Sequence, residues 1–375
     1  MLIWSIVIVS AAWVGFAYVG YPLLLMWLVR VSPRPVREAA ISPPLSVIIT
    51  VHNGAAELPA KLEATLALAY PGMKEVIVSS DGSTDDTEAI VKRFEDRGVR
   101  LVASSERGGK EAGQARAIAV AKGEILVFTD GRTRLADDAL VELVKPFADP
   151  DVGSVSSEDD VESDGGEGAY VRYEMALRRL ESQATTLVGL SGSCFAVRRE
   201  LADPWPSDLA SDFRTALETA RRGYRAVAQP SALASFGTVD DPAIEWQRKV
   251  RTVRRGLAVL GHHRALLSPR HGRTAFSLWG HKVARFTSPF ALIALLLASA
   301  WGAASSAVLA VFFVLQVAAY LGGALSLVSK RVAAFFPLRI AGFFLLVNAS
   351  MLQAWGHHLR GERAVVWTPT REQSS

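Results

Sequence analysis

The sequence predicts an α/β domain with a mostly parallel sheet, inserted between transmembrane helices. Segments of strand-like and helix-like periodicity alternate across residues 45–130 of the 375-residue chain. Uncharged apolar runs lie near both ends, at residues 2–29 and 289–328. Because about 20 apolar residues span a bilayer, we expect one helix from the first run and a hairpin of two from the second.

We interpret residues 1–29 as an N-terminal transmembrane helix. A secretory signal peptide is the alternative, but the run is too long and lacks both a basic leading segment and a clear cleavage site. Basic residues follow the two apolar runs: Arg30, Arg34, Arg37, Lys330 and Arg331. Because such residues favour the cytoplasmic side, we expect a multi-pass protein of the plasma or inner membrane whose central domain is cytosolic.

A C-terminal membrane region is expected over residues 287–356, followed by a tail over 357–375. Its last apolar segment, residues 332–355, is interrupted by polar residues and a proline: Pro337, Arg339, Asn348 and Gln353. The segment is therefore compatible with a third span or with a helix in the membrane interface.

The composition excludes some classes of protein. A net charge of only +4 gives no support to nucleic-acid binding. The lone Cys194 rules out an internal disulfide and suits a cytosolic domain.

The elements of the central domain follow a proline-rich linker at residues 30–44. We expect strands, rich in β-branched residues, at 45–51, 74–81, 99–104 and 124–130, and helices at 58–69, 85–97 and 110–122. These strands are nearly continuous in apolar residues, as expected for a parallel sheet covered on both faces.

Polar residues gather where these strands end, and ligands of such sheets bind beyond the carboxyl ends of the strands. They are Thr50, His52, Asn53, Asp81, residues 104–110 and Asp130. Asp81 stands ahead of a turn, and we expect it to bind a ligand. Asp130 ends a buried strand, where a charge needs a metal, a cation or a solvated cleft, although it could also cap the following turn.

Several segments, in this order, together resemble glycosyltransferase family 2, in the branch of membrane-bound synthases that includes cellulose, hyaluronan and poly-N-acetylglucosamine synthases. They are "LSVIITVHNGAAELPAKLEATLALAYP", "EVIVSSDGSTDDT", "RGGKEAGQARAIAVAKGEILVFTDG" and "GSCFAVRRE" with "PSDLASDF" and "GYRAVAQPSALA". The resemblance implies a GT-A fold over residues 45–236 that binds a nucleotide sugar, usually UDP-linked, and transfers the sugar with inversion.

The resemblance also implies roles for single residues. Thr50, Asn53 and Glu57 match the first donor-binding motif, Asp81 the acid that contacts the nucleoside, and Lys110 a basic residue near it. Asp130 matches the first acid of the DxD motif, which holds Mg²⁺ or Mn²⁺ on the diphosphate. Asp212 matches the general base, and its alternative is to cap a helix over residues 213–222. A leaving diphosphate needs positive charge, and an attacking hydroxyl needs a base, so these residue types suit the reaction.

Two departures from the family pattern concern charge. Arg132 stands where the second acid of DxD is expected, so it is either a turn residue or a cation that approaches the donor diphosphate. The QxxRW signature of processive synthases is not intact, and Gln247, Arg248 and Arg251 are candidates for contact with the acceptor or the diphosphate in that region.

Amphipathic helices on the membrane surface are expected over residues 237–286. One such helix has an apolar face formed by Val250, Val253, Leu257 and Leu260, and its basic residues need no role beyond adsorption to the membrane. A C-terminal segment at 367–371, "WTPTR", resembles a motif of some relatives that closes over the site.

The sequence therefore predicts a membrane-embedded inverting glycosyltransferase that extends a polysaccharide or glycolipid acceptor. The alternative is a catalytically impaired subunit that binds nucleotide sugar or acts as a scaffold in a biosynthetic complex. The expected partners are a nucleotide sugar, the acceptor, the bilayer and a second copy of the chain or an export partner, and no nucleic acid.

Overall fold

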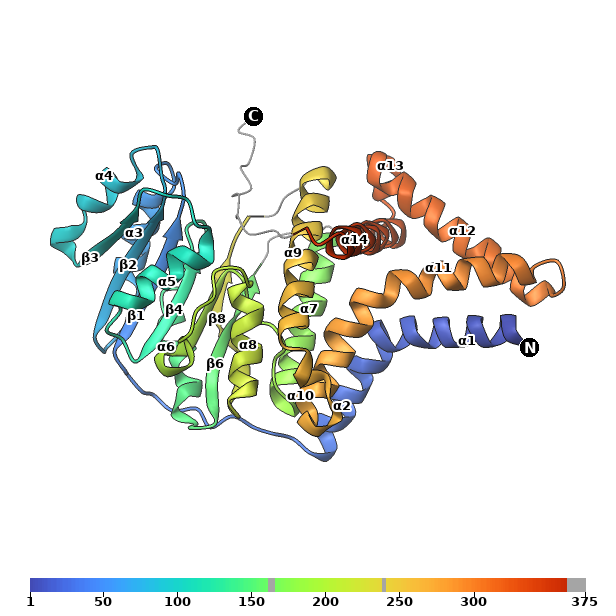
Figure 1. The fold of residues 1–375 in the computed structure, drawn as a ribbon, viewed down its shortest axis with the longest axis horizontal. Coiled ribbons are helices and arrows are strands. Elements are labelled where there is room, and N and C mark those ends of the chain that lie inside the picture. Colours follow the sequence, from blue (N-terminus) through green and yellow to red (C-terminus); the bar gives the residue numbers. More distant parts are fainter. Residues whose placement is uncertain (161–165, 238–240, 363–375) are drawn as a thin grey trace.

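The computed structural model describes residues 1–160, 166–237 and 241–362, in which the strands form one mixed sheet (Figure 1). The strand order is β3-β2-β1-β4-β7-β6-β8-β5. The strands are β1 Leu45–Val51, β2 Lys74–Asp81, β3 Val99–Ser104, β4 Ile125–Asp130, β5 Arg134–Leu135, β6 Val152–Asp160, β7 Cys194–Arg198 and β8 Arg225–Ser235. The four strands expected from the sequence lie together and run parallel, so the predicted fold class is confirmed.

The second half of the sheet supplies its antiparallel part. Strand β7 runs antiparallel to both β4 and β6, and β5 runs antiparallel to β8. Because β7 pairs directly with β4, residues near 194 lie beside residues near 129. This pairing brings the loop before β7 to the edge of the sheet at which β4 ends.

Helices cover both faces of the sheet. They are α3 Leu58–Ala67, α4 Thr87–Lys92, α5 Lys110–Val120, α6 Ala139–Val144, α7 Gly166–Ala184 and α8 Ser211–Arg221. Helix α4 is shorter than the expected helix over 85–97, because a 3₁₀ turn, Glu95–Arg97, follows it and ends at Gly98 with φ 86°. Asp85 stays outside α4, and its carboxylate accepts a hydrogen bond from the backbone N–H of Thr87 at 3.1 Å.

Successive side chains of the central strands point alternately into two hydrophobic layers, one on each face of the sheet. Val47 and Ile49 of β1 point into the layer that contains α3, α4 and α6, whereas Ile48 points into the opposite layer with α5 and α8. Burial on both faces explains why these strands are apolar throughout. Polar side chains are then concentrated at the strand ends, where the sheet meets water.

The membrane region is built from long apolar helices at both ends of the chain. They are α1 Leu2–Gly15 continued by a π-helical turn and α2 Tyr21–Val31, then α10 Arg273–Ser277, α11 Ala284–Gly302, α12 Ala307–Val328, α13 Lys330–Ala333 and α14 Phe336–Leu359. Among the described residues, four helical stretches are long and apolar enough to cross a membrane: Leu2–Val31, Arg273–Gly302, Ala307–Val328 and Phe336–Leu359. The predicted hairpin turns between α11 and α12, as the sequence indicated.

These helices do not all run the same way (Figure 1). Helices α1 and α11 lie side by side across the picture, with the N-terminus and the α11–α12 turn at the end far from the sheet. Helix α14 is seen almost end-on, so it runs crosswise to α1 and α11. Whether α14 crosses the membrane or lies in its interface stays a prediction, although its length and composition suit a span.

Helices α7 and α9, the latter Pro242–His262, stand between the sheet domain and the membrane helices (Figure 1). The apolar face expected on α9 is covered by protein: Val250, Val253 and Leu257 pack with Leu346 and Met351 of α14. This apolar face is therefore not available to lipid. A basic residue of α9 also contacts α14, since Lys249 Nζ lies 5.7 Å from the ring centroid of Phe343.

A buried ionic cluster joins α7 to the membrane helices. The Glu174 carboxylate contacts His281 Nε2 and Arg285 Nη1, each at 2.6 Å, and Glu181 contacts His281 Nδ1 at 2.8 Å. The hydroxyl of Tyr21 donates to the Glu181 carboxylate at 2.6 Å. Burial opposes the charge of Glu174, but His281 and Arg285 hold its pKa well below the ordinary value. We call this group the junction cluster.

Candidate active site

The candidate site lies where β1, β2 and β4 end. Thr50 is the register partner of both Asp130 on β4 and Ser79 on β2, and Asp81 is the last residue of β2. Parallel strands end at the same edge of a sheet, which is why residues 31 to 80 positions apart meet here. The edge predicted from the strand ends is thus the edge that the fold builds.

Asp130 and Lys110 form the central ion pair of this edge. Lys110 is the first residue of α5, and its Nζ lies 2.5 Å from Asp130 Oδ1. Burial alone would lower the pKa of Lys110, but the charges of Asp130, Glu111 and Asp212 raise it above the ordinary value. The ammonium therefore stays charged at neutral pH.

Asp212, in the first turn of α8, lies near the same Lys110 ammonium. Lys110 Nζ donates to the carbonyl oxygen of Gly192 at 3.3 Å, and a Cβ on Gly192 would lie 3.4 Å from Asp212 Oδ2. Asp212 is the second residue of α8, whose N-cap is Ala210, so it does not cap the helix as the alternative required. The structure thus brings Asp130, Lys110 and Asp212 together around Gly192.

The loop that carries Gly192 is held by a serine pair that the sequence did not single out. The hydroxyls of Ser191 and Ser193 each lie 2.5 Å from Asp159 Oδ1 at the end of β6. The Ser193 carbonyl in turn accepts from the backbone N–H of Asp130 at 3.2 Å. These contacts fix the distance between the ends of β4 and α8.

Asp81 is buried and its two carboxylate oxygens already have donors. Oδ1 accepts from Gly108 N at 3.0 Å and from Arg116 Nη2 at 2.7 Å, and Oδ2 accepts from Gly109 N at 2.7 Å. The side chain therefore holds the glycine turn at which α5 and Lys110 begin. Its predicted contact with a nucleoside stays a prediction, and the observed contacts show a positioning role.

Thr50 and Asn53 lie at the end of β1. Asn53 has a φ of 52°, which asparagine tolerates, and its Oδ1 accepts from Thr84 N at 2.8 Å. The Thr50 hydroxyl is buried without a hydrogen-bond partner among the described residues. Asn53 thus ties the loops after β1 and β2 together, and their roles toward a donor stay predictions.

Arg132 leaves the turn after β4 and meets Glu57 on the rim of the site. Its Nη2 lies 2.7 Å from Glu57 Oε1, and the two side chains are 44% and 40% exposed. An exposed pair of this kind contributes little to stability. Glu57 therefore orients an accessible guanidinium beside the Asp130 turn.

Lys61 lies beneath the same turn and was missed from the sequence. Its Nζ donates to Thr129 Oγ1 at 3.1 Å and to the Thr133 carbonyl at 2.6 Å, and the residue is only 7% exposed. Burial lowers the pKa of Lys61 to about 8, against the opposing influence of Cys194 and Asp130. The signal was available, because Lys61 lies three residues after Leu58 on the apolar face of its helix.

The basic residues of α9 are arranged differently from the expectation. Gln247 is exposed, and Arg248 pairs with Glu245 of its own helix at 2.7 Å. Burial, followed by the charges of Arg255 and Arg248, lowers the pKa of Arg251. The helix is tied to the site edge by Arg255, which pairs with the buried Glu111 of α5. Contact of Gln247, Arg248 and Arg251 with substrate stays a prediction, and residues 367–371 lie outside the described residues.

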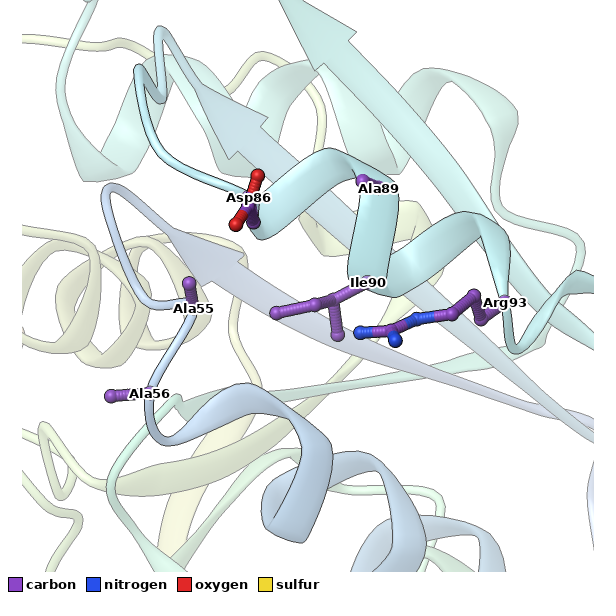
Figure 2. A pocket seen from close by; sticks show the side chains of 6 residues that line it. All are labelled: Ala55, Ala56, Asp86, Ala89, Ile90 and Arg93. Atoms are coloured by element: carbon purple, nitrogen blue, oxygen red, sulfur yellow. The ribbon is translucent and has the colours of Figure 1, made fainter.

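A hollow of about 660 Å³ lies beside the site, behind the loop after β1 (Figure 2). Ala55 and Ala56 line it from that loop, and Asp86, Ala89, Ile90 and Arg93 line it from α4 and its end. None of the predicted donor-binding or catalytic residues belongs to this lining. We therefore place the candidate site at the Lys110–Asp130 edge and not in the hollow.

The protein ligands available to a divalent metal at this edge are few. Across the described residues no group of three or more His, Cys, Asp or Glu side chains could hold an ion. Mg²⁺ in such sites is usually held by one or two carboxylates together with substrate phosphates. Asp130 is the one carboxylate at the turn, and its charge is already balanced by Lys110.

The chain is similar in sequence and in fold to known glycosyltransferases. Residues 46–204 match the family model described as Glycosyl transferase family 2. A mannosyltransferase of Pyrobaculum calidifontis, solved with GDP-Man and Mn²⁺, superposes with a TM-score of 0.74 and 25% identity, over 96% of this chain and 100% of that one.

Two curated relatives match over somewhat more than half of the chain. An N-acetylglucosaminyltransferase of Rhizobium meliloti is 27% identical over 232 residues, which are 55% of this chain and 53% of the relative. A poly-β-1,6-N-acetyl-D-glucosamine synthase of Staphylococcus aureus is 24% identical over 228 residues, 58% of this chain and 55% of the relative. The chain thus spans about half the length of these relatives.

Proposed function

We propose that the chain, whose residues 46–204 match the model of glycosyl transferase family 2, transfers a sugar from a nucleotide diphosphate sugar to a hydroxyl of a saccharide or glycolipid acceptor. The observation that carries the proposal is the convergence of Lys110, Asp130 and Asp212 around Gly192. It provides a cation for a leaving phosphate and a carboxylate base within one small region.

In the proposed reaction the acceptor oxygen attacks the anomeric carbon of the donor from the face opposite the diphosphate. The bond between that carbon and the phosphate oxygen breaks, its electron pair stays with the nucleoside diphosphate, and the configuration inverts. The hydroxyl proton passes to the Asp212 carboxylate. Asp212 lies in the first turn of α8, where its Oδ1 accepts a hydrogen bond from the backbone N–H of Phe213 at 2.8 Å.

The membrane helices suggest where the acceptor comes from. We propose that the sheet domain lies in the cytosol, where nucleotide sugars occur, and that the acceptor is presented from the bilayer side. Helices α7 and α9 stand between the sheet and the membrane helices (Figure 1), and we expect the acceptor to approach the site from that side. The relatives, which are named as synthases or transferases of N-acetylglucosamine or mannose, support this class of substrate.

The test of this function is Asp212→Asn in the full chain, assayed with a panel of UDP- and GDP-sugars. We expect kcat to fall by at least about 100-fold, the usual contribution of a general base, while donor binding changes little. Asp208→Asn, at an exposed aspartate four residues earlier, is the matched control and should remain active. Unchanged transfer by Asp212→Asn would exclude it as the base. Donor binding without turnover by the natural chain would favour the scaffold alternative.

A further inference from the structure

The turn after β4 is surrounded by positive charge. Lys110 pairs with Asp130 at 2.5 Å on one side of the turn, and Lys61 binds Thr129 and Thr133 from beneath. Arg132 projects from the turn itself and is 44% exposed. Three cationic side chains thus lie at one turn that carries a single carboxylate.

This arrangement is unfavourable for a divalent cation. An ion bound to Asp130 would have to share or displace Lys110, and the buried Lys61 would repel it through protein of low dielectric constant. The residue that could add a second carboxylate from the turn is instead Arg132. Glu57, the nearest acid on the rim, is itself paired with Arg132.

The same cations suit a diphosphate. Guanidinium groups bind phosphate with two parallel hydrogen bonds, and an ammonium acts as a point charge toward phosphate oxygens. Arg132 is accessible, and its ion pair with Glu57 is exposed and therefore weak. Lys110 is held at the start of α5, with a helix N-terminus and the Gly108–Gly109 turn beside it.

We propose that Lys110 and Arg132 neutralise the donor diphosphate, so that this enzyme binds nucleotide diphosphates without a divalent metal. The inference rests on the proposed function, since it concerns the donor of that reaction. When the bond to the sugar breaks, the electron pair on the phosphate oxygen is stabilised by N–H groups of these two side chains. Lys61 is too buried to touch the donor and acts by fixing the turn and adding positive charge below it.

The experiment measures binding of UDP and of GDP to the full chain in detergent by titration calorimetry, once with EDTA and once with Mn²⁺. We expect at least one nucleotide to bind, with dissociation constants that agree within about threefold in the two conditions. Arg132→Gln should weaken binding at least about tenfold in both, because a charge-assisted hydrogen bond is lost.

Arg132→Asp gives the sharper result, because it restores the second acid of the turn. We expect its binding to be weak in EDTA and to recover when Mn²⁺ is added. The matched control is Arg134→Asp, at an exposed arginine two residues further along, which should bind as the natural chain does.

The outcomes separate this inference from the proposed function. Binding of nucleotide by the natural chain only when Mn²⁺ is present would overturn the inference and leave the proposed function standing. Metal-independent binding that Arg132→Gln does not weaken would also overturn it, since Arg132 would then be an idle turn residue. Failure of both nucleotides to bind in either condition would overturn the proposed function together with the inference.

Discussion

Lys61 shows how one buried charge can shape a site that it does not touch. Its ammonium satisfies Thr129 Oγ1 and the Thr133 carbonyl, on either side of Asp130 and Arg132. Holding a charge at this depth costs stability, because burial favours the neutral amine. The hydrogen bonds of Lys61 to Thr129 and Thr133 offset this cost, and they keep the turn in one conformation.

This cost predicts a pH dependence of stability. An unfolded lysine keeps its proton up to about pH 10.5, whereas folded Lys61 releases it near pH 8. Between these values the unfolded chain binds more protons, so this residue makes the free energy of unfolding rise with pH. Relative to Lys61→Met, the natural chain should gain up to about 3 kcal/mol across this window.

The measurement is unfolding of the detergent-solubilised chain at pH steps from 7.5 to 10.5. Lys92→Met removes an exposed lysine of α4 and should follow the natural chain throughout. A constant difference between the natural chain and Lys61→Met at every pH would show that Lys61 does not titrate in this range.

Predictions from the sequence were least complete for individual residues and their contacts. Asp130, Lys110 and Asp212 were chosen from strand ends and family motifs, and the fold brings all three together around Gly192. The contacts of Asp81 with Gly108, Gly109 and Arg116 could not be predicted, because they depend on how a loop closes over a strand end. Lys61 was missed because a lysine is normally assigned to the surface.

At the scale of elements, the helices of the membrane region meet through small residues. A Cβ on Gly342 of α14 would lie 2.1 Å from Ser326 Oγ and 2.8 Å from the Gly323 carbonyl oxygen, both on α12. The serine could rotate away, but the backbone carbonyl can move only with its helix. Close contact between α12 and α14 therefore requires glycine at 342.

We predict that Gly342→Ala destabilises the protein by about 1–3 kcal/mol, the usual cost of overpacking. Gly356→Ala is the matched control, since it lies in the same helix and a Cβ there meets nothing within 4 Å. It should be neutral or slightly stabilising, because alanine favours a helix over glycine. Thermal unfolding in detergent compares the two, and equal effects would show that the α12–α14 contact is not tight.

Elements differ in how far the sequence predicts them. β1, β2 and β3 have the predicted bounds, because short runs rich in apolar and β-branched residues between turn residues mark strands. Helix α7 was not predicted, since its buried Glu174 and Glu181 read as surface residues until His281 and Arg285 are placed against them. Such a partnership joins residues 100 or more positions apart, and no local pattern reveals it.

At the scale of the whole molecule, the junction cluster and the α9–α14 contact fasten the sheet domain to the membrane helices. The N-terminus and the α11–α12 turn lie at the far end of α1 and α11, away from the sheet (Figure 1). Helix α14 runs crosswise to these two helices and packs along α9. This arrangement suggests three crossings and one helix parallel to the membrane surface.

We therefore predict the topology by single introduced cysteines and a membrane-impermeant maleimide on intact cells. Ala304→Cys, in the turn between α11 and α12, should be labelled from outside. Lys330→Cys and Arg360→Cys, at the start of α13 and just after α14, should be labelled only after the cells are opened. All three native side chains are exposed, so burial does not decide the result.

The last position decides the role of α14. Labelling of Arg360→Cys from outside would show that α14 crosses the membrane, and labelling of Lys330→Cys from outside would reverse the orientation of the hairpin. The sequence alone left α14 undecided, because its hydropathy suits both arrangements. The direction of α14 relative to the other membrane helices follows only from its packing against α9 and α12.

Cys194 lies in β7 beside Thr129, in the interior of the sheet. Burial raises the pKa of its thiol to about 12, although Lys61 opposes the shift. Maleimides and oxidants react with the thiolate form of cysteine. At Cys194 the raised pKa keeps the thiolate fraction small, and burial shields the sulfur from reagents. The native cysteine therefore does not compete in thiol labelling. Probes can be attached at single introduced cysteines while Cys194 is left in place.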